Sequence, residues 1–453
     1  MKAVFFEINS AISAFVWGPP MLAVFLGTGL FLSAKSRFFQ IFGIKEWVGK
    51  TVASAFKNRK TETTDSGSVS QFGALTSALA ACLGTGNIVG VATALFSGGP
   101  GAVFWMCVSA ILGMMTCCCE NILGIKYRVK DSAGHWAGGP MFYIERGLGM
   151  KGLAGIYALL LVGASLGMGN MTQANSVSQG LAGFGISPWI TAAILSTAVI
   201  ACVSGGLKRI TAVSQALIPL LSAAFVVACF AVIAVNAENL VPCIKLIFKE
   251  AFTLKAASGF GLAKAARYGI SRGVFSNEAG LGSSAIIHAA ADCKKAGEQG
   301  MWGILEVFID TVFMCTVTAA AILSSGVMQE NPSLNGVELC SAVFESVFGK
   351  AGGYFLNICI CLFAFATLVA WSYYGKSGAE YLFGKKSGKI YNILYAVAAF
   401  AGCVMKLDSV WSLSDTLNGL MAVPNIFALL LLSKEAVALL NEAQIKKERI
   451  SAP

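Results

Sequence analysis

Apolar residues occupy most of this chain in long blocks that short polar loops separate. A helix needs about 20 mostly apolar residues to cross a membrane, and eleven blocks reach or approach that length. The pattern predicts an all-α polytopic membrane protein with eleven transmembrane helices. We place these spans at 12–33, 71–96, 101–125, 153–183, 188–204, 212–235, 257–287, 301–325, 351–374, 388–406 and 409–432.

The lysines and arginines divide unevenly between the two sides that these spans create. One side holds 24 of the 33, and the other side holds six. Positively charged loops stay in the cytoplasm, so we expect the N-terminus outside the cell and the C-terminus inside. The basic side comprises loops 34–70, 126–152, 205–211, 288–300 and 375–387, Lys389 and the tail after 432.

Span 257–287 is kept although Lys264, Arg267, Arg272 and Glu278 lower its hydropathy. Without this span every later loop would change sides, and the charge asymmetry would be spoiled. The net charge of +10 therefore reflects topology, and it requires no nucleic-acid partner.

Composition agrees with a bundle whose outer surface faces lipid. Hydrophobic residues make up 56% of the chain, the mean hydropathy is +0.72, and charged residues make up 12%, about half the share in soluble domains. The 14 cysteines include no CxxC pair, and the two histidines are isolated. We therefore expect neither a disulfide framework nor a metal cluster.

Span 71–96 is interrupted at Gly84-Thr85-Gly86-Asn87. Glycine and asparagine are poor helix formers, and the backbone groups that such a break frees need partners inside a membrane. The half before the break ends in free carbonyls near 80–83, which suit a cation. The half after it begins with free N–H groups near Gly86, which suit a carboxylate. A packing face of small residues is the alternative interpretation.

Span 257–287 carries a second interruption, with Gly269, Gly273, Gly280 and Gly282 among polar residues. When the first span is set aside, the two interrupted spans each begin a five-helix half. Interrupted helices at matching positions of two halves indicate an inverted-repeat transporter with a site between them. The expected divisions are 1–70 for the extra helix and a basic loop, 71–235 and 236–432 for the two repeats, and 433–453 for a cytoplasmic tail.

Five motifs carry a resemblance that covers nearly the whole chain. They are GALTSALAACLGTGNIVGVATAL (73–95), AGGPMFYIERGLG (137–149), GNMTQANSVS (169–178), RGVFSNEAGLGSS (272–284) and WSYYG (371–375). In this order they resemble the alanine or glycine:cation symporter family, also called the sodium:alanine symporters. The resemblance implies a leucine-transporter-like fold with one extra helix before a 5+5 core. It also implies sodium-driven uptake of alanine or glycine, and a bacterial plasma (inner) membrane as the location.

The resemblance places substrate-binding residues on four helices. The N–H groups of Thr85 and Gly86 would bind the substrate carboxylate, with Asn87 close by. Asn170 and Gln173 lie three apart on one face and would bind the zwitterion, although contacts between helices are their alternative role. The other candidates near the pocket are Gly273, Phe275, Ser276 and Trp371, of which Phe275 has core packing and Trp371 interfacial anchoring as alternatives.

A sodium site is implied between the first broken helix and span 351–374. The implied ligands are the Thr367 hydroxyl and the backbone oxygens of Ala80, Leu83 and Ala364. Hard oxygen ligands suit Na⁺. Leu368 stands where related folds often have a second hydroxyl.

Glu306 and Asp310 lie four apart in span 301–325 and would repel each other unless they are paired or protonated. One interpretation is a salt-bridge network with Lys264, Arg267 and Arg272 that braces a closed inner gate. The other is a proton-coupling site. The polar loop 133–149 is expected to lie near the gate, or else to be a plain connector.

The function expected is symport of a small neutral amino acid, alanine or glycine, with Na⁺ as coupling ion and no organic cofactor. Coupling to H⁺ stays open as an alternative, and a channel is a further one. A primary pump is disfavoured because no P-loop pattern occurs. An enzyme is disfavoured because the two histidines form no constellation. The oligomeric state is not predicted.

Overall fold

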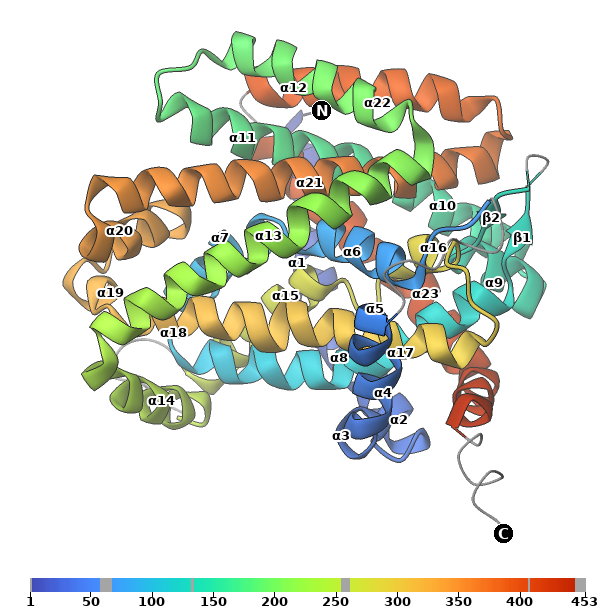
Figure 1. Ribbon diagram of the computed structural model, residues 1–453, viewed down its shortest axis with the longest axis horizontal. Helices are drawn as coiled ribbons and strands as arrows, with labels where there is room; N and C mark the ends of the chain where they lie inside the picture. The colour runs from blue at the N-terminus through green and yellow to red at the C-terminus, as the bar shows by residue number, and fades with distance from the viewer. Residues whose placement is uncertain (1, 58–66, 132–133, 254–260, 406–407, 445–453) are drawn as a thin grey trace.

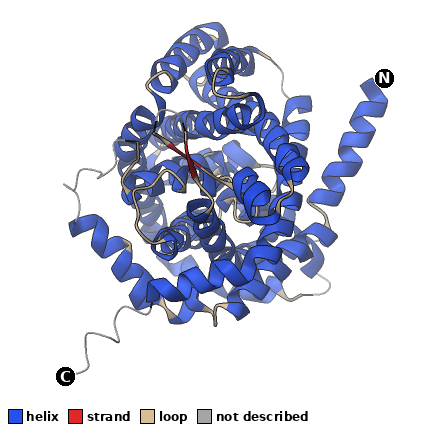
Figure 2. Ribbon diagram, turned by 90° about the vertical axis from the view of Figure 1, so that its right-hand side faces the viewer, coloured by secondary structure: helices blue, strands red, loops and turns tan. Residues whose placement is uncertain are grey.

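The structure, a computed structural model, describes residues 2–57, 67–131, 134–253, 261–405 and 408–444. Long helices lie side by side in one bundle, and the described strands are a single two-stranded hairpin at one end (Figure 1). Seen from that end, the helices surround the hairpin, and the first helix lies at the edge of the bundle, where it packs on the last helix (Figure 2).

The elements in chain order begin with α1 (Lys2–Val16), α2 (Pro19–Lys35), α3 (Phe39–Phe42), α4 (Ile44–Lys50), α5 (Val52–Lys57), α6 (Gln71–Cys82), η1 (Thr85–Asn87), α7 (Val89–Gly98), α8 (Gly101–Lys126), β1 (Val129–Lys130), β2 (Trp136–Ala137), α9 (Pro140–Leu148), α10 (Lys151–Leu166), η2 (Gly167–Met171), α11 (Thr172–Ala182), α12 (Pro188–Val203) and α13 (Gly206–Val235). They continue with α14 (Ala237–Ala251), α15 (Leu262–Asn277), α16 (Ser284–His288), α17 (Ala296–Val307), η3 (Phe308–Cys315), α18 (Thr316–Ser324), α19 (Val327–Glu330), α20 (Gly336–Phe348), α21 (Lys350–Phe383), α22 (Ser387–Val404) and α23 (Asp408–Gln444).

Eight helical stretches of the described chain are long and apolar enough to cross a membrane. They match eight of the eleven predicted spans, and the first one includes the turn at Trp17-Gly18 that divides α1 from α2. The three remaining spans are shorter or interrupted helices, namely α6 with α7, α12, and α15 with α16. Part of the predicted span 257–287, residues 257–260, lies outside the described residues.

The first broken helix has its interruption at the predicted position. α6 ends at Cys82, a single 3₁₀ turn holds Thr85–Asn87, and α7 starts at Val89. The Gly84 N–H donates to Cys82 O at 2.7 Å instead of to the carbonyl four residues back. A turn of this kind leaves the preceding carbonyls free for other donors.

The second broken helix is interrupted later than its glycines suggested. Gly269 and Gly273 lie inside α15, and the break covers residues 278–283. Glu278 has a φ of 56°, and Gly280 and Gly282 have φ of 97° and 80°. Glycine adopts this left-handed region at no steric cost, which explains why the chain turns there.

Gly269 and Gly273 have a different function, which is close packing. A Cβ on Gly269 would lie 2.3 Å from Ala102 O, and a Cβ on Gly273 would lie 2.5 Å from Ser109 Oγ. Both neighbours belong to α8, so these glycines let α15 approach α8 closely, as small residues do between membrane helices.

Other helices hold the backbone groups that the second break frees. Gly280 N–H donates to Glu120 Oε1 at 2.9 Å, and Asn425 Nδ2 donates to Gly280 O at 2.8 Å. The Tyr157 hydroxyl donates to Leu281 O at 2.9 Å. The break is thus fixed by side chains from α8, α10 and α23, which satisfies the rule that buried polar groups need partners.

The predicted gate loop 133–149 contains strand β2, which pairs with β1 just before it, and helix α9, which packs beside this second break. The position of a Cβ on Gly282 lies 2.4 Å from Pro140 at the start of α9. Buried Tyr143 bonds to Asn425 on α23, and Tyr381 on α21 donates to Glu145 Oε2 at 2.8 Å.

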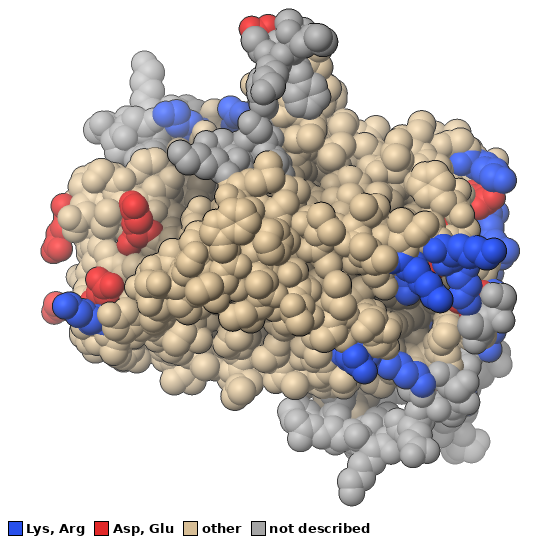
Figure 3. Space-filling view, turned by 90° about the horizontal axis from the view of Figure 1, so that it is seen from above, with Lys and Arg blue, Asp and Glu red and all other residues tan. Residues whose placement is uncertain are grey.

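Charged residues gather at the two ends of the bundle. Lys and Arg dominate the end that is on the right of Figure 3, where acidic residues are few, and Asp and Glu dominate the left end. Most of the surface between them carries no charged side chain on this face. Such a surface suits the hydrocarbon core of a bilayer.

Candidate functional site

The two broken helices meet at their interruptions. The position of a Cβ on Gly86 lies 3.7 Å from Ser276 Cα, so the 3₁₀ turn of the first helix touches the end of α15. Asn87 and Ser276 are both buried. Both donate hydrogen bonds to one carboxylate, that of Asp310.

Asp310 sits on η3, a stretch of π-helix in the middle of its span. Asn87 Nδ2 donates to Asp310 Oδ1 at 2.7 Å, and Ser276 Oγ donates to Oδ2 at 2.9 Å. The Thr311 hydroxyl donates to Oδ2 at 2.6 Å and itself accepts from Asn277 Nδ2 at 3.1 Å. π-Helical turns are frequent at functional sites, and three donors suit an ionised carboxylate.

Asp310 is fully buried, and no lysine or arginine of the described chain forms an ion pair with it. The Asn87 Oδ1 beside it is also buried and has no partner. A buried negative charge and a free carbonyl oxygen together favour a cation at this position.

The end of α6 faces α21 at the predicted ion position. The Thr367 hydroxyl donates to Ala80 O at 2.9 Å, a carbonyl that the turn at Gly84 leaves free. A Cβ on Gly84 would lie 2.7 Å from Thr367 Oγ1. Thr367 is therefore brought together with Ala80, and both are buried, as are Leu83 and Ala364.

Trp371 lies one turn beyond Thr367 on α21 and reaches the second break. Its Nε1 donates to Glu278 Oε1 at 3.1 Å, and the side chain is fully buried. A Cβ on Gly169 would lie 2.5 Å from Trp371 Cβ, so the indole packs directly on the backbone of η2. This buried position excludes the alternative of an interfacial anchor.

Asn170 and Gln173 straddle the end of η2. Asn170 Nδ2 donates to Tyr395 O on α22 at 2.6 Å, and Gln173 Nε2 donates to Met168 O at 3.2 Å. Both amide oxygens are buried without a partner. The Asn170 amide thus links two helices, while the two unpaired oxygens keep a substrate role open for both residues.

Gly273 and Phe275 are turned toward other neighbours. Gly273 packs on α8. The Phe275 ring makes an edge contact with Trp17, with centroids 6.3 Å apart, and Arg272 lies 5.6 Å from its centroid. Their recorded contacts are with α8 and with the α1–α2 turn, and their role at the substrate site stays a prediction.

The prediction of a salt-bridge network is wrong. In the described chain Glu306 pairs with His288, whose Nε2 lies 3.0 Å from Glu306 Oε2, and Glu278 bonds to Ser283 and Trp371. No ion pair of the described residues joins Lys264, Arg267 or Arg272 to these carboxylates. The carboxylates bond instead to polar side chains of neighbouring elements, Asp310 to Asn87 and Ser276 and Glu306 to His288.

Sequence reasoning noticed Asp310 as an intramembrane charge but did not assign it to the site, and it assigned no role to His288. One signal was available. An acidic residue in a span is a candidate functional residue by default, and Asn87 and Ser276 both needed a partner. Helical spacing alone could not show that η3 aims Asp310 at both breaks.

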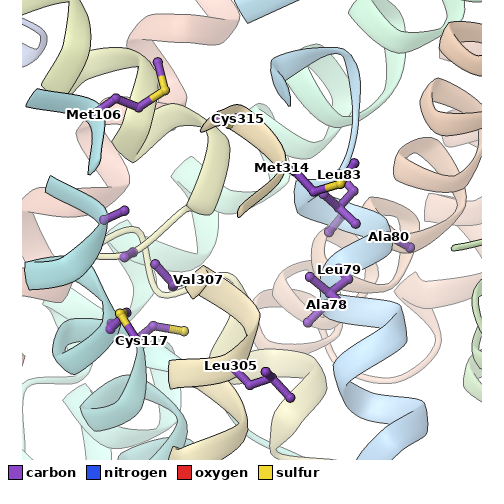
Figure 4. Packing of buried hydrophobic residues seen from close by; sticks show 14 of the residues in the cluster. Ala78, Leu79, Ala80, Leu83, Met106, Cys117, Leu305, Val307, Met314 and Cys315 are labelled. Carbon is purple, nitrogen blue, oxygen red and sulfur yellow. The ribbon is translucent and has the colours of Figure 1, made fainter. Parts of the chain in front are cut away.

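Apolar side chains surround this polar centre. Figure 4 shows residues of α6, α8, α17 and η3 facing one another, among them Leu79, Leu83, Cys117, Leu305 and Met314. All five are buried. Such a surrounding lowers the local dielectric and strengthens each interaction of the polar groups that it encloses.

Two interrupted helices thus meet beside a buried carboxylate, and the comparison with known proteins identifies the family. A model of the sodium:alanine symporter family matches residues 1–452. The chain belongs to this family. It is 40% identical over 442 residues to the sodium/alanine symporter AgcS of Methanococcus maripaludis, covering 96% of each chain. It is 39% identical over 435 residues to an uncharacterized transporter of Haemophilus influenzae, covering 94% of each.

A solved structure with the same fold is that of MhsT in complex with L-phenylalanine. It superimposes with a TM-score of 0.60 and 13% identity, covering 83% of this chain and 98% of MhsT. This likeness confirms the leucine-transporter-like fold that the sequence motifs implied. The family and the relatives are transporters, so the enzyme alternative is set aside.

The site generates one prediction about Asp310. Asp310→Asn keeps the shape of the side chain but removes the negative charge that we expect to face a cation, and it replaces one of the two acceptor oxygens by an NH₂ donor. Truncating one partner of a buried charge pair costs about 2 to 5 kcal/mol, so we expect alanine binding in the presence of Na⁺ to weaken roughly 30-fold or more. Isothermal titration or scintillation proximity binding measures this loss.

The control is Glu330→Gln, which removes an exposed carboxylate on α19 and should leave binding unchanged. The dependence of binding on Na⁺ concentration then shows whether Asp310 faces the sodium ion or the ammonium group of the substrate. A smaller apparent number of Na⁺ ions identifies the ion, and an unchanged number identifies the substrate ammonium group. Wild-type affinity in Asp310→Asn would contradict a role for the charge.

Proposed function

We propose that this protein carries alanine or glycine into the cell together with Na⁺ by alternating access. The single observation that supports this proposal most is the junction of the two breaks at Gly86, Ser276 and Asp310. The relative AgcS is named a sodium/alanine symporter, which favours the same chemistry here.

An amino acid presents a carboxylate and an ammonium group on the same carbon atom. The N–H groups of Thr85 and Gly86 begin the second half of the broken helix, where the helix dipole favours an anion. Asp310 and the free oxygen of Asn87 adjoin these N–H groups. The site therefore offers a positive and a negative end within the reach of one small zwitterion.

A small side chain fits the close packing at this junction. A Cβ on Gly86 would already lie at van der Waals distance from Ser276, and Trp371 is buried against Gly169 and Glu278. Among neutral amino acids, alanine and glycine demand the least room there. Asn170 and Gln173 would add the hydrogen bonds that their unpaired oxygens allow.

Sodium would lie where the carbonyl end of α6 faces α21. The Ala80 carbonyl and the Thr367 hydroxyl already face each other across 2.9 Å, and an entering ion would replace the hydroxyl proton as the partner of the carbonyl. Leu83 O and Ala364 O would complete the set of hard oxygen ligands. The negative end of the helix dipole adds to the attraction.

Alternating access would use eleven helices, an extra first helix followed by two five-helix repeats. The division falls at 71–235 and 236–432, with 433–453 as the tail. The basic end of the bundle (Figure 3) would face the cytoplasm, which puts the N-terminus outside. α9 and the hairpin lie at that end, so α9 would cover the second break in the closed state.

The first test is uptake into proteoliposomes. Labelled alanine should accumulate under an inward Na⁺ gradient and should not accumulate under a pH gradient alone, because the α6–α21 ligands are oxygens without an exchangeable carboxyl proton. Liposomes without protein provide the background. Accumulation driven by H⁺ in the absence of Na⁺ would overturn sodium coupling, and uptake that never exceeds the outside concentration would indicate a channel.

The second test concerns the close approach at Gly86. Gly86→Leu places a branched side chain against Ser276, where a Cβ already has its nearest atom at 3.7 Å. We expect alanine affinity to fall at least tenfold, about 1.4 kcal/mol, while the protein stays monodisperse in size-exclusion chromatography. Gly86→Ala adds only the Cβ and serves as the matched control with near-normal binding. Equal affinity in both variants would make the break purely structural.

The third test concerns the ion. Thr367→Ala removes the hydroxyl that faces Ala80 O, so the Na⁺ concentration for half-maximal uptake should rise about tenfold, as the loss of one good ligand interaction implies. Thr367→Ser keeps a hydroxyl and should behave like the wild type. If Thr367→Ala leaves the Na⁺ dependence unchanged, Thr367 is not an ion ligand.

A further inference from the structure

A chain of hydrogen-bonded side chains leads from the interior of the bundle to the start of α6. His288 Nε2 lies 3.0 Å from Glu306 Oε2, and His288 Nδ1 lies 2.5 Å from Gln299 Nε2. Gln71 Nε2 donates to Gln299 Oε1 at 3.1 Å. His288, Glu306 and Gln299 have no exposed surface, whereas Gln71 is half-buried. The chain thus connects α16, α17 and α6.

His288 and Glu306 are the two members of this chain that can gain or lose a proton. With one proton between them the pair has no net charge, whether as imidazolium and carboxylate or as neutral imidazole and carboxylic acid. Without that proton the pair has one net negative charge. A buried net charge is costly inside a membrane, so the closed structure favours the pair with one proton.

The groups around the pair also favour the form that holds one proton. Glu306 faces three further carboxyl groups, which are Glu120 on α8, Glu278 at the second break and Asp310 on η3. Its other neighbours are neutral donors, namely Ser284 Oγ at 2.7 Å and the thiols Cys82 and Cys117 at 3.6 and 3.8 Å. The Tyr374 hydroxyl on α21 also faces it.

Positive charges lie farther out. Arg128 caps the segment after α16 by donating to Ala289 O at 2.9 Å and to Ala291 O at 2.7 Å. Helices α4, α8 and α23 pack on α17. Their charged groups toward the surface are the pairs Glu46–Lys50 and Lys126–Glu435, together with Lys45, Lys434 and Glu442. No ion pair of the described residues joins a lysine or an arginine to Glu306.

We infer that His288 and Glu306 form a proton-binding site that exchanges with the cytoplasm, and that releasing its proton accompanies opening of the inner side. This inference rests on the proposed function for the orientation and for the opening step. Opening on that side would part α6 from α17 at the Gln71–Gln299 bond and admit water to the pair. Once water surrounds His288 and Glu306, a net charge on the pair is no longer costly.

The amide of Gln299 suits this exchange. An amide group can present either its nitrogen or its oxygen, so it can donate to a bare His288 Nδ1 or accept from a protonated one. Each rotation of the Gln299 amide exchanges the donor and the acceptor in its hydrogen bond with Gln71. The start of α6 is thus coupled to the proton on His288.

The direction of the pH effect follows from the difference in bound protons between the closed and the open state. The closed state holds the proton, and the open state releases it to the cytoplasm. A higher cytoplasmic pH therefore favours opening, by up to about tenfold per pH unit for one proton. Because the pair meets only the cytoplasmic side, no proton crosses the membrane.

The test uses right-side-out vesicles of an expression host that has no alanine uptake of its own. The Na⁺ gradient and the outer pH stay fixed, and the inner pH is varied from about 6.5 to about 8.5. We expect the initial rate of alanine uptake to rise several-fold over this range. Varying the outer pH at a fixed inner pH should have no effect.

Two variants remove the proton site and one serves as the matched control. His288→Gln and Glu306→Gln should transport at a rate that does not depend on the inner pH. His135→Gln replaces the other histidine, which is 59% exposed in the hairpin loop, and should keep the wild-type slope. A flat profile in the wild type, or a wild-type slope in His288→Gln, overturns the inference.

A second measurement needs no change at the pair. His135→Gln leaves His288 as the only histidine, so its ring gives the only imidazole signals in a labelled sample. With saturating alanine and Na⁺, we expect these signals to stay constant from about pH 6.5 to about 8.5. Free titration in that range overturns the inference. Absence of Na⁺-driven uptake at every pH refutes the proposed function instead.

Discussion

Two helices of this protein are interrupted inside the apolar part of the bundle. The backbone N–H and C=O groups at these two stops must find hydrogen-bond partners without bulk water. Backbone groups that lose their helical partners cost several kcal/mol each in such surroundings. At the second stop, Glu120, Tyr157 and Asn425 supply the missing partners from three helices. At the first stop, Thr367 holds one freed carbonyl, and the N–H end is left for a ligand. The helices that surround the stops are placed by these bonds.

The buried carboxylates follow the same logic. Glu120, Glu278, Glu306 and Asp310 are all buried, and in the described chain their partners are amides, hydroxyls, an indole and one histidine instead of lysine or arginine. A hydrogen bond from a neutral donor to a carboxylate costs less to break than a buried ion pair, whose rupture costs about 3 to 5 kcal/mol. Helices joined by neutral hydrogen bonds can therefore separate and rejoin at moderate cost, which a transporter that changes shape requires.

The sequence alone predicted the parts of this arrangement that depend on local preference. Poor helix formers at 84–87 marked the first break correctly, and long apolar blocks marked the eight spans. It failed where tertiary contacts decide. Gly269 and Gly273 had the same composition signal as Gly280 and Gly282, yet the first two lie in a helix packed on α8 and only the second two have positive φ.

Asp310 shows the same limit at the site itself. Regular helical spacing puts Glu306 and Asp310 on one face, and that regularity suggested a shared salt-bridge network. In the structure Asp310 lies on the π-helix η3 and meets Asn87 and Ser276, while Glu306 on α17 meets His288. A π-turn leaves no composition signal as strong as glycine does, because its residues are ordinary helix residues.

The first break also explains why an ion and a substrate should bind together. The Ala80 carbonyl and the Gly86 N–H belong to opposite ends of one short turn, so a ligand at either end fixes the backbone that the other ligand needs. A second ligand that meets an ordered site loses less conformational entropy on binding than the first. This coupling is reciprocal by thermodynamic necessity. Without ligands, the carbonyl end of the break has the Thr367 hydroxyl as its side-chain partner. We propose that symport follows from the geometry of this one interrupted helix, and that Ser276 of the second interrupted helix and Asp310 of η3 supply the surface against which the bound pair is held.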